Sequence, residues 1–121
     1  MKALLPIVGI AALAAGTAYA DCPYPTAPAK LPDGATATMD EMLAGQKAVR
    51  AYDQAIKDYV ACIDKELEDN IAKAGDTLKP EQKADMQKVE AQKHNAAIDQ
   101  DQAVATRFNE QVKVFKTRDT K

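Results

Sequence analysis

Proline is distributed so unevenly along this chain that its positions limit where long helices can form. After residue 20, four prolines fall between Pro23 and Pro32, and the only other one is Pro80. Proline has no backbone N–H and its ring clashes with the preceding helical turn, so helix interiors exclude it. The pattern predicts an extended arm over residues 21–37, followed by two long proline-free helices.

The first helix is predicted over residues 39–74. Thr38 and Glu41 form a capping box, in which each side chain accepts a hydrogen bond from the backbone N–H of the other residue. Gly75 is expected to end the helix in the left-handed conformation. Apolar side chains recur at helical spacing: Met42, Val49, Tyr52, Ile56, Tyr59, Val60, Ile63, Leu67 and Ile71.

The second helix is predicted over residues 80–116. Pro80 suits a first helical turn, and Glu81 follows near the positive end of the helix dipole. Its apolar stripe is Met86, Val89, Ala97, Ile98, Val104, Ala105, Phe108, Val112 and Phe115. Two long helices joined by about five residues pack antiparallel, so the fold class is all-α, a two-helix hairpin with coiled-coil-like packing.

Residues 1–20 have the three parts of a cleavable signal peptide. Lys2 supplies the positive charge, Ala3 to Ala15 form a short apolar run, and residues 18–20 read A-Y-A, a cleavage site. An uncleaved membrane anchor is the alternative, which the shortness of the run disfavours, since a membrane helix needs about 20 apolar residues. We therefore expect a periplasmic or secreted protein.

Two cysteines, Cys22 and Cys62, remain after this cleavage. In an oxidising compartment such a pair is more often a structural disulfide than two free thiols. A redox-active pair is the alternative, but the Cys-x-x-Cys arrangement typical of that chemistry is absent. A bridge would close a loop of about 40 residues and would contribute about 4 kcal/mol to stability.

The disulfide would dock the proline-rich arm on the first helix. Polyproline II repeats every three residues, so Cys22, Pro25, Pro28 and Leu31 share one edge. The difference in rise per residue between a polyproline II arm and an α-helix sets the level that each arm residue reaches. It places Pro25 near Ile56 and Tyr59, Pro28 near Val49 and Tyr52, and Leu31 near Leu43. Two helices alone bury little area, so we expect that the arm adds a third layer, that the hairpin dimerises as a four-helix bundle, or both.

Composition and motifs argue against most chemistry. Without Lys2, 15 basic residues face 18 acidic ones, a net charge of −3 that disfavours nucleic acid as a partner. Serine is absent from residues 21–121, and no glycine-rich phosphate loop is present. Glu90 and His94 share a helical face, yet a zinc site needs three or four ligands, so we expect a solvated Glu90 and no metal or cofactor.

Two resemblances add to these predictions. Cys22-Pro-Tyr-Pro, residues 31–42 (LPDGATATMDEM), Tyr59-Val-Ala-Cys, His94-Asn and Phe108-Asn-Glu-Gln resemble uncharacterised small exported helical proteins of Gram-negative bacteria. That resemblance implies a fold and no active residues. Residues 78–82 (LKPEQ) with Met86 are similar to the LTxxQ motif of Spy-like periplasmic chaperones, from which Lys79 departs because the motif has threonine there.

Two functions remain in contention, and neither is enzymatic. The first is an exported structural or protein-binding module that presents its helices to an unknown protein or to a second copy of itself. The alternative is a periplasmic holdase of the Spy-like kind, which requires an apolar patch that the arm leaves uncovered.

Overall fold

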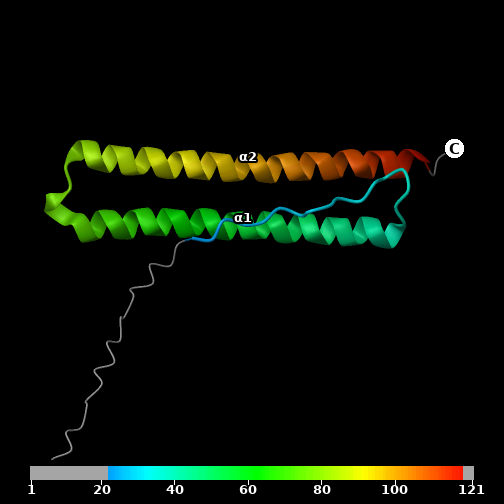
Figure 1. Cartoon of the computed structure of the whole chain (residues 1–121), viewed down its shortest axis with the longest axis horizontal. Coiled ribbons are helices and arrows are strands. Elements are labelled where there is room, and N and C mark those ends of the chain that lie inside the picture. Colours follow the sequence, from blue (N-terminus) through cyan, green and yellow to red (C-terminus); the bar gives the residue numbers. More distant parts are fainter. Residues whose placement is uncertain (1–21, 119–121) are drawn as a thin grey trace, which may run out of the picture.

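A computed structural model describes residues 22–118, which form two long helices and an extended arm (Figure 1). Helix α1 spans Met39–Ala74, a short 3-10 turn η1 spans Gly75–Thr77, and helix α2 spans Pro80–Arg118. The helices pack antiparallel, and a disulfide ties the arm to α1. The all-α hairpin with a stapled arm is therefore confirmed. The predicted signal peptide, residues 1–20, lies outside the described residues.

Local side-chain caps set the start of each helix. At α1, the Glu41 N–H donates to Thr38 Oγ1 at 3.2 Å, and the Thr38 N–H donates to Glu41 Oε2 at 2.8 Å. Two N–H donors at the start of the helix are thereby satisfied, as the capping box predicts. At α2, the Lys79 N–H donates to Gln82 Oε1 at 3.0 Å. This helix continues two residues beyond the predicted end at residue 116.

Gly75 ends α1 in a different conformation from the one expected. Its φ is 51° and its ψ is −133°, whereas a left-handed cap has ψ near +47°. The Gly75 N–H still donates to the Ile71 carbonyl oxygen, and the chain turns directly into η1. A positive φ with this ψ is accessible almost only to glycine, so the residue type is required even though the cap geometry differs.

Most buried side chains of the hairpin recur at intervals of eleven residues. Tyr52 and Ile63 of α1 are related in this way, and so are Val104 and Phe115 of α2; all four are buried. Eleven residues make three turns at 3.67 residues per turn, so each position returns to the same face of its helix. The repeat keeps α1 and α2 in contact along the hairpin, and the buried residues form two clusters on either side of Val49.

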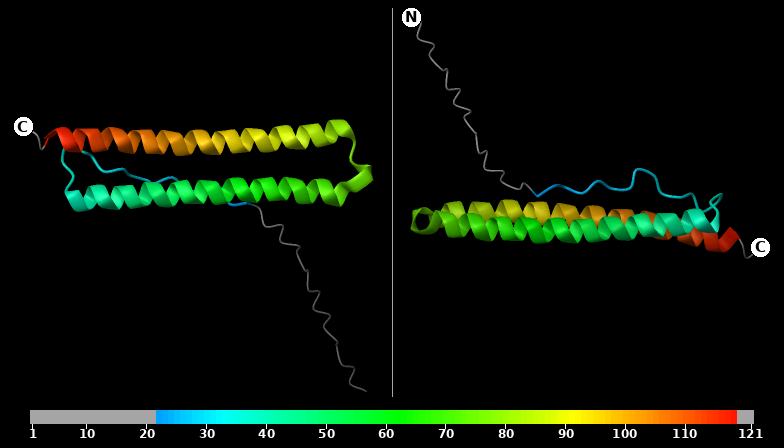
Figure 2. Two further views of the ribbon diagram at one scale, coloured as in Figure 1. Left: turned by 180° about the vertical axis from the view of Figure 1, so that it is seen from behind. Right: turned by 90° about the horizontal axis from the view of Figure 1, so that it is seen from below.

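The arm, from residue 22 onward, lies along one face of the hairpin, and no other described segment lies on the opposite face (Figure 2). Cys22 and Cys62 are joined by the disulfide, with their Cα atoms 5.7 Å apart. The half-buried arm residues include every third one, Cys22, Pro25, Pro28 and Leu31, and also Ala27 and Pro32, whereas Pro23, Tyr24, Thr26, Ala29 and Lys30 are exposed. This spacing is that of a polyproline II strand with one edge against the helices.

The far end of the arm is clamped against α2. A Cβ added to Gly34 would lie 2.0 Å from the Gln111 carbonyl oxygen, so only glycine allows this approach to α2. The Gly34 N–H donates to Gln111 Oε1 at 2.9 Å, and the Arg118 guanidinium donates to the carbonyls of Gly34 and Ala37 at 3.3 and 2.6 Å. The arm therefore contacts α2 as well as α1.

One predicted neighbour along the arm is wrong. Leu43, expected beside Leu31, is 53% exposed, and Leu31 packs instead on the cluster that contains Met42 and Phe108. The residue of α1 that meets the arm at this level is Gly45, where an added Cβ would lie 2.6 Å from the Pro32 ring. The rise per residue of the arm and of the helix placed Leu31 at the correct level along α1. It could not give the side of α1 that faces the arm.

Candidate binding groove

A groove between α1 and α2 continues beyond the point where the arm begins. We call it the open groove; its volume is about 310 Å³. It is lined by Ile63, Glu66, Leu67 and Asn70 of α1 and by Asp85, Met86, Val89, Glu90 and Lys93 of α2. These positions lie between Cys62, which holds the arm, and the turn that joins the helices.

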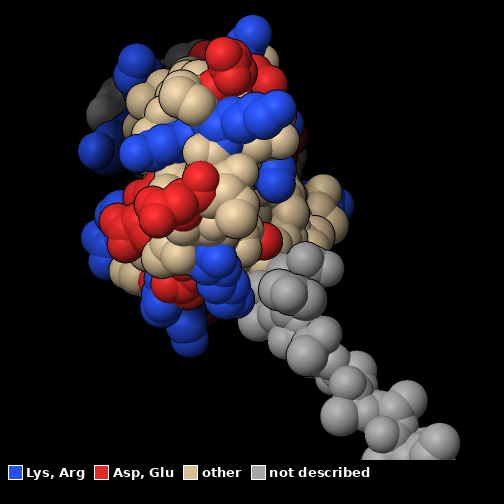
Figure 3. All heavy atoms as spheres, turned by 90° about the vertical axis from the view of Figure 1, so that its left-hand side faces the viewer, with Lys and Arg blue, Asp and Glu red and all other residues tan. Residues whose placement is uncertain are grey.

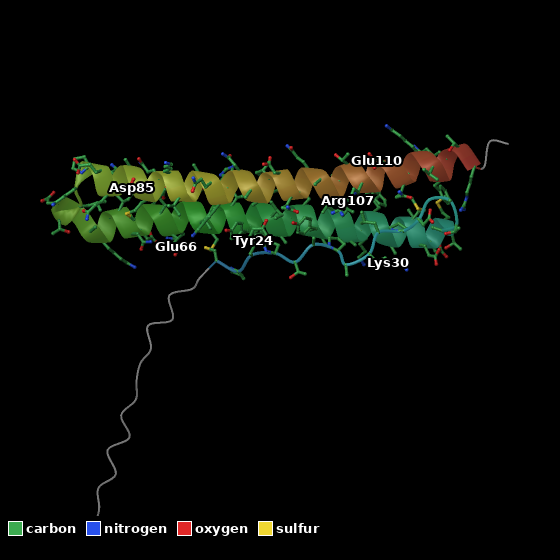
Figure 4. The ribbon with its side chains drawn as sticks, turned by 45° about the horizontal axis from the view of Figure 1, so that its top comes forward. Tyr24, Lys30, Glu66, Asp85, Arg107 and Glu110 are labelled. Atoms are coloured by element: carbon green, nitrogen blue, oxygen red, sulfur yellow. A yellow bond between two sulfur atoms is a disulfide. The ribbon has the colours of Figure 1, made fainter. Side chains whose placement is uncertain are left out.

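The open groove lies on the same face of the hairpin as the arm. Glu66 and Asn70 follow Ala55 and Tyr59 by eleven residues, and the latter two border the arm at Pro25. On α2, Asp85 precedes Arg107, which borders the arm, by twice that interval. Residues related by this repeat share one face of a helix. Figure 4 shows Glu66 and Asp85 on the turn side of Tyr24, beyond the described part of the arm.

The chemistry of the open groove is an apolar floor with a mostly acidic rim. Ile63 is buried, Leu67 and Met86 are half-buried, and Val89 is 50% exposed. Glu66 and Asp85 line it with carboxylates. Large apolar side chains are costly to leave in water, so an uncovered floor of this kind favours binding of an apolar ligand.

The arm shows what kind of chain this interhelical surface accepts. The Tyr24 ring packs edge-on against the Tyr59 ring with centroids 5.0 Å apart. Ala27 packs against the central cluster, and the Pro32 ring sits on Gly45. All of these contacts come from an extended strand whose apolar side chains and prolines rest on helical residues, with few hydrogen bonds.

The structure places the predicted site residues as follows. Cys22 and Cys62 form the disulfide, as expected. Pro25 borders a hollow together with Ala55 and Tyr59. Tyr52, Ile56 and Tyr59 belong to the central core cluster, and Val49 packs against both clusters. Pro28 lines a hollow together with Val104 and Arg107 of α2, a helix that the sequence analysis did not consider as a docking surface.

A second polar feature, which we call the lower carboxyl cluster, consists of Asp64, Glu90 and His94. One ligand atom from each of the three side chains lies within 4.8 Å of the others. His94 Nδ1 is 3.8 Å from Glu90 Oε1, and the Glu90 side chain is only 18% exposed. Glu90 Oε1 is buried and accepts no hydrogen bond within the described part of the chain. The prediction of a solvated Glu90 is therefore wrong.

Proximity of the two carboxyl groups explains the protonation behaviour of Glu90. Sharing a proton with the Asp64 carboxyl is the largest cause that raises the pKa of Glu90, and burial adds to it. His94 acts in the opposite direction, since an imidazolium favours the carboxylate form.

An upper carboxyl pair, Asp53 and Asp101, stands eleven residues away on each helix. Burial and the neighbouring Asp53 raise the pKa of Asp101, and Asp101 Oδ1 is also buried without a hydrogen-bond partner in residues 22–118. Here a fixed cation is present, because Lys57 Nζ lies 2.6 Å from Asp53 Oδ2. The hydrogen bond from Lys57 lowers the pKa of Asp53.

Sequence reasoning missed Asp64 and the α2 side of the groove for the same reason. The spacing of Glu90 and His94 is visible within one helix, whereas Asp64 joins them only through the register of α1 against α2. The eleven-residue spacing relates Asp53 to Asp64 and Glu90 to Asp101 within each helix, but it does not set the register between the helices.

No protein-family model, curated protein or solved structure matches this chain. Among residues 22–118, neither helix is apolar enough over a sufficient length to cross a membrane. Figure 3, which views the turn end of the hairpin, shows basic and acidic side chains interspersed with uncharged ones. That end therefore presents no patch of a single charge.

Proposed function

We propose that this protein is a non-enzymatic, exported peptide-binding module that holds an extended segment of another protein in the open groove. The observation that carries the proposal is the arm, a tethered proline-rich strand that already occupies the covered half of the same face. The open groove continues that surface with an uncovered apolar floor.

The groove defines the chemistry of the bound segment. Apolar residues or prolines at every third position would meet Leu67, Met86 and Val89, as the arm residues meet the covered half. A polyproline II segment is already stiff, so it loses little entropy on binding. A basic residue would pair with Glu66 or Asp85 at the rim. The expected partner is a proline-bearing, basic, extended segment.

Selection from a peptide library tests this specificity. The library should carry prolines at every third position and random residues between them, and the bait is the protein with its disulfide intact. We expect enrichment of peptides with apolar and basic residues, which bind with micromolar dissociation constants measured by fluorescence anisotropy. Absence of enrichment over a charge-matched helical bait would contradict the proposal.

A matched pair of variants locates the site. Val89→Asp places a charge on the floor of the open groove and should weaken peptide binding at least about tenfold, because a carboxylate is costly to desolvate there. Val114→Asp makes the same change at an α2 residue that is also exposed but lies outside the groove. Equal loss of binding in both variants would place the peptide elsewhere.

The alternative function is a holdase, and it depends on the same uncovered floor. A holdase binds many unfolded chains without a sequence preference, whereas a dedicated module selects one motif. Suppression of the aggregation of a denatured test protein, lost in Val89→Asp and kept in Val114→Asp, would favour the holdase. Peptide selectivity without such suppression would favour the module.

A further inference from the structure

The lower carboxyl cluster brings three side chains from both helices to one point. Asp64 comes from α1, and Glu90 and His94 lie one turn apart on α2. Their ligand atoms lie within 4.8 Å of one another, and His94 Nδ1 is 3.8 Å from Glu90 Oε1. Ligand atoms at about 2.1 Å from a tetrahedral metal lie about 3.4 Å apart, so a side-chain movement of about an ångström would suffice.

Glu90 Oε1 is the buried oxygen of this cluster, and the His94 Nδ1 atom lies 3.8 Å from it, too far for a hydrogen bond. Glu90 Oε1 is excluded from water and accepts no hydrogen bond within residues 22–118. A second carboxyl group, that of Asp64, stands beside it. Burying an acceptor without a donor costs about 1–3 kcal/mol, so a positively charged ligand at this point would remove a real penalty.

The upper carboxyl pair has the same two carboxyl groups with a lysine beside them, although Asp101 Oδ1 also accepts no hydrogen bond within residues 22–118. There, Asp53 and Asp101 occupy the positions equivalent to Asp64 and Glu90, and the Lys57 ammonium lies 2.6 Å from Asp53. The lysine sits four residues after the α1 aspartate and supplies the cation within the chain.

Two residues differ between the lower cluster and the equivalent positions of the upper carboxyl pair. Glu68 occupies the position equivalent to Lys57, so the fixed cation is replaced by a further acid. His94 occupies the position equivalent to Ala105, so an imidazole is added on α2. The upper pair therefore has a lysine and no imidazole, whereas the lower cluster has an imidazole and no lysine at the equivalent position.

We propose that Asp64, Glu90 and His94 form a binding site for a divalent transition-metal ion of the zinc type. Two carboxylate oxygens and one imidazole nitrogen are ligands that zinc accepts, and a fourth position would be filled by water. The ion would bridge α1 and α2 beside the open groove, to which Glu90 belongs. It would stabilise the turn half of the hairpin in the way that the disulfide stabilises the arm half.

Calorimetric titration with zinc chloride tests the site on the protein with its disulfide intact, after treatment with a chelator. We expect one equivalent to bind with a micromolar dissociation constant, and the thermal midpoint to rise with zinc concentration, since binding to the folded state alone stabilises it. His94→Ala and Glu90→Gln should each weaken binding about 100-fold. Circular dichroism checks that both variants remain helical.

The upper carboxyl pair provides matched controls. Asp101→Asn removes a carboxylate from the equivalent position and should leave the zinc affinity unchanged. Lys57→Glu with Ala105→His rebuilds the lower cluster at the upper pair and should raise the stoichiometry from one zinc to two. The His94 imidazole resonances should shift on adding zinc to the wild type, which reports direct coordination.

Three results would overturn the proposal. The first is an absence of saturable binding at millimolar zinc. The second is a His94→Ala variant that is helical and binds zinc as tightly as the wild type. The third is a titration in which the imidazole resonances of His94 do not move although zinc binds, because the ion would then sit elsewhere.

Discussion

The two halves of the hairpin use one helical surface differently. In the half toward the open end, the arm lies along the hairpin, is fastened by the Cys22–Cys62 disulfide and is clamped at Gly34, and it leaves hollows of about 530 and 460 Å³ beside it. In the half toward the turn, the equivalent positions line an open groove, and Val89 is left exposed. The difference arises because the arm is tethered midway along α1, so it reaches one half only.

The comparison suggests a division of roles between two halves built on one sequence repeat: the covered half stabilises the fold, and the uncovered half is where we place ligand binding. The same eleven-residue pattern continues through both halves, so the helices present similar surfaces throughout. Covering one half supplies the buried area that a two-helix hairpin otherwise lacks. The uncovered half is then available to a ligand, which is why we place the proposed peptide site there.

The largest predicted effect is loss of the disulfide. Cys22→Ser with Cys62→Ser releases the arm from α1, and the loop-entropy argument predicts a loss of about 4 kcal/mol in the free energy of unfolding. Urea unfolding followed by circular dichroism measures it. Addition of reductant to the wild type should give the same shift, and an unchanged unfolding midpoint would show that the arm contributes little.

Replacing a valine by alanine should lower the free energy of unfolding more in the covered half than in the open groove. Val104→Ala empties space beside the covered half, where the side chain is 1% exposed, and should cost about 2 kcal/mol. Val89→Ala alters the open groove and should change stability by less than about 0.5 kcal/mol. Thermal or urea unfolding checks both, and similar losses would mean that something covers Val89.

Gly34→Ala tests the clamp at the far end of the arm. The added methyl group would meet backbone atoms of Gln111 and Phe115, which cannot rotate away, so we expect a loss of about 1–3 kcal/mol. Hydrogen exchange should increase at the neighbouring arm amides and remain unchanged near the open groove. Ala35→Gly, at the exposed next residue, is the control. Unchanged stability of Gly34→Ala would argue against the close contact with α2.

The smallest predicted effect concerns pH. The folded-state pKa of Asp101 is raised, so this group stabilises the fold fully below its ordinary pKa of about 3.9 and loses that contribution as pH rises through the raised value. Asp101→Asn removes the unfavourable charge and should stabilise the protein at neutral pH by about 0.5 kcal/mol, after allowance for solvent screening.

Urea unfolding at about pH 4 and about pH 7 measures this difference. The advantage of Asp101→Asn should shrink toward acid, where the wild-type carboxyl is protonated. Asp99→Asn, which changes an exposed carboxylate on the same helix, should show little effect at either pH. A stabilisation by Asp101→Asn that does not depend on pH would rule out repulsion between the carboxyl groups as its cause.

The helices were predictable because their signals are local. Thr38 with Glu41 fixes the start of α1, Gly75 fixes its end, and Pro80 opens α2. The disulfide followed from two cysteines in a chain that begins like an exported protein. Each of these inferences needs only neighbouring residues or composition.

The contacts between helices were less predictable because they depend on rotation and register. The exposed Leu43 and the contact of Gly45 with Pro32 are decided by the angle at which α1 faces the arm. The meeting of Asp64 with Glu90 is decided by the level at which the helices pair. An error of one residue rotates a helix by about 100°, which periodicity alone does not resolve.

Solvent exposure of the groove side chains tests the central claim most directly. In methyl NMR spectra with a soluble paramagnetic agent, the account predicts strong relaxation enhancement for the Val89 and Met86 methyl groups and protection of Val104. Equal protection of Val89 and Val104 in the ligand-free protein would contradict it, because a second copy or the rest of the chain would then already cover the open groove.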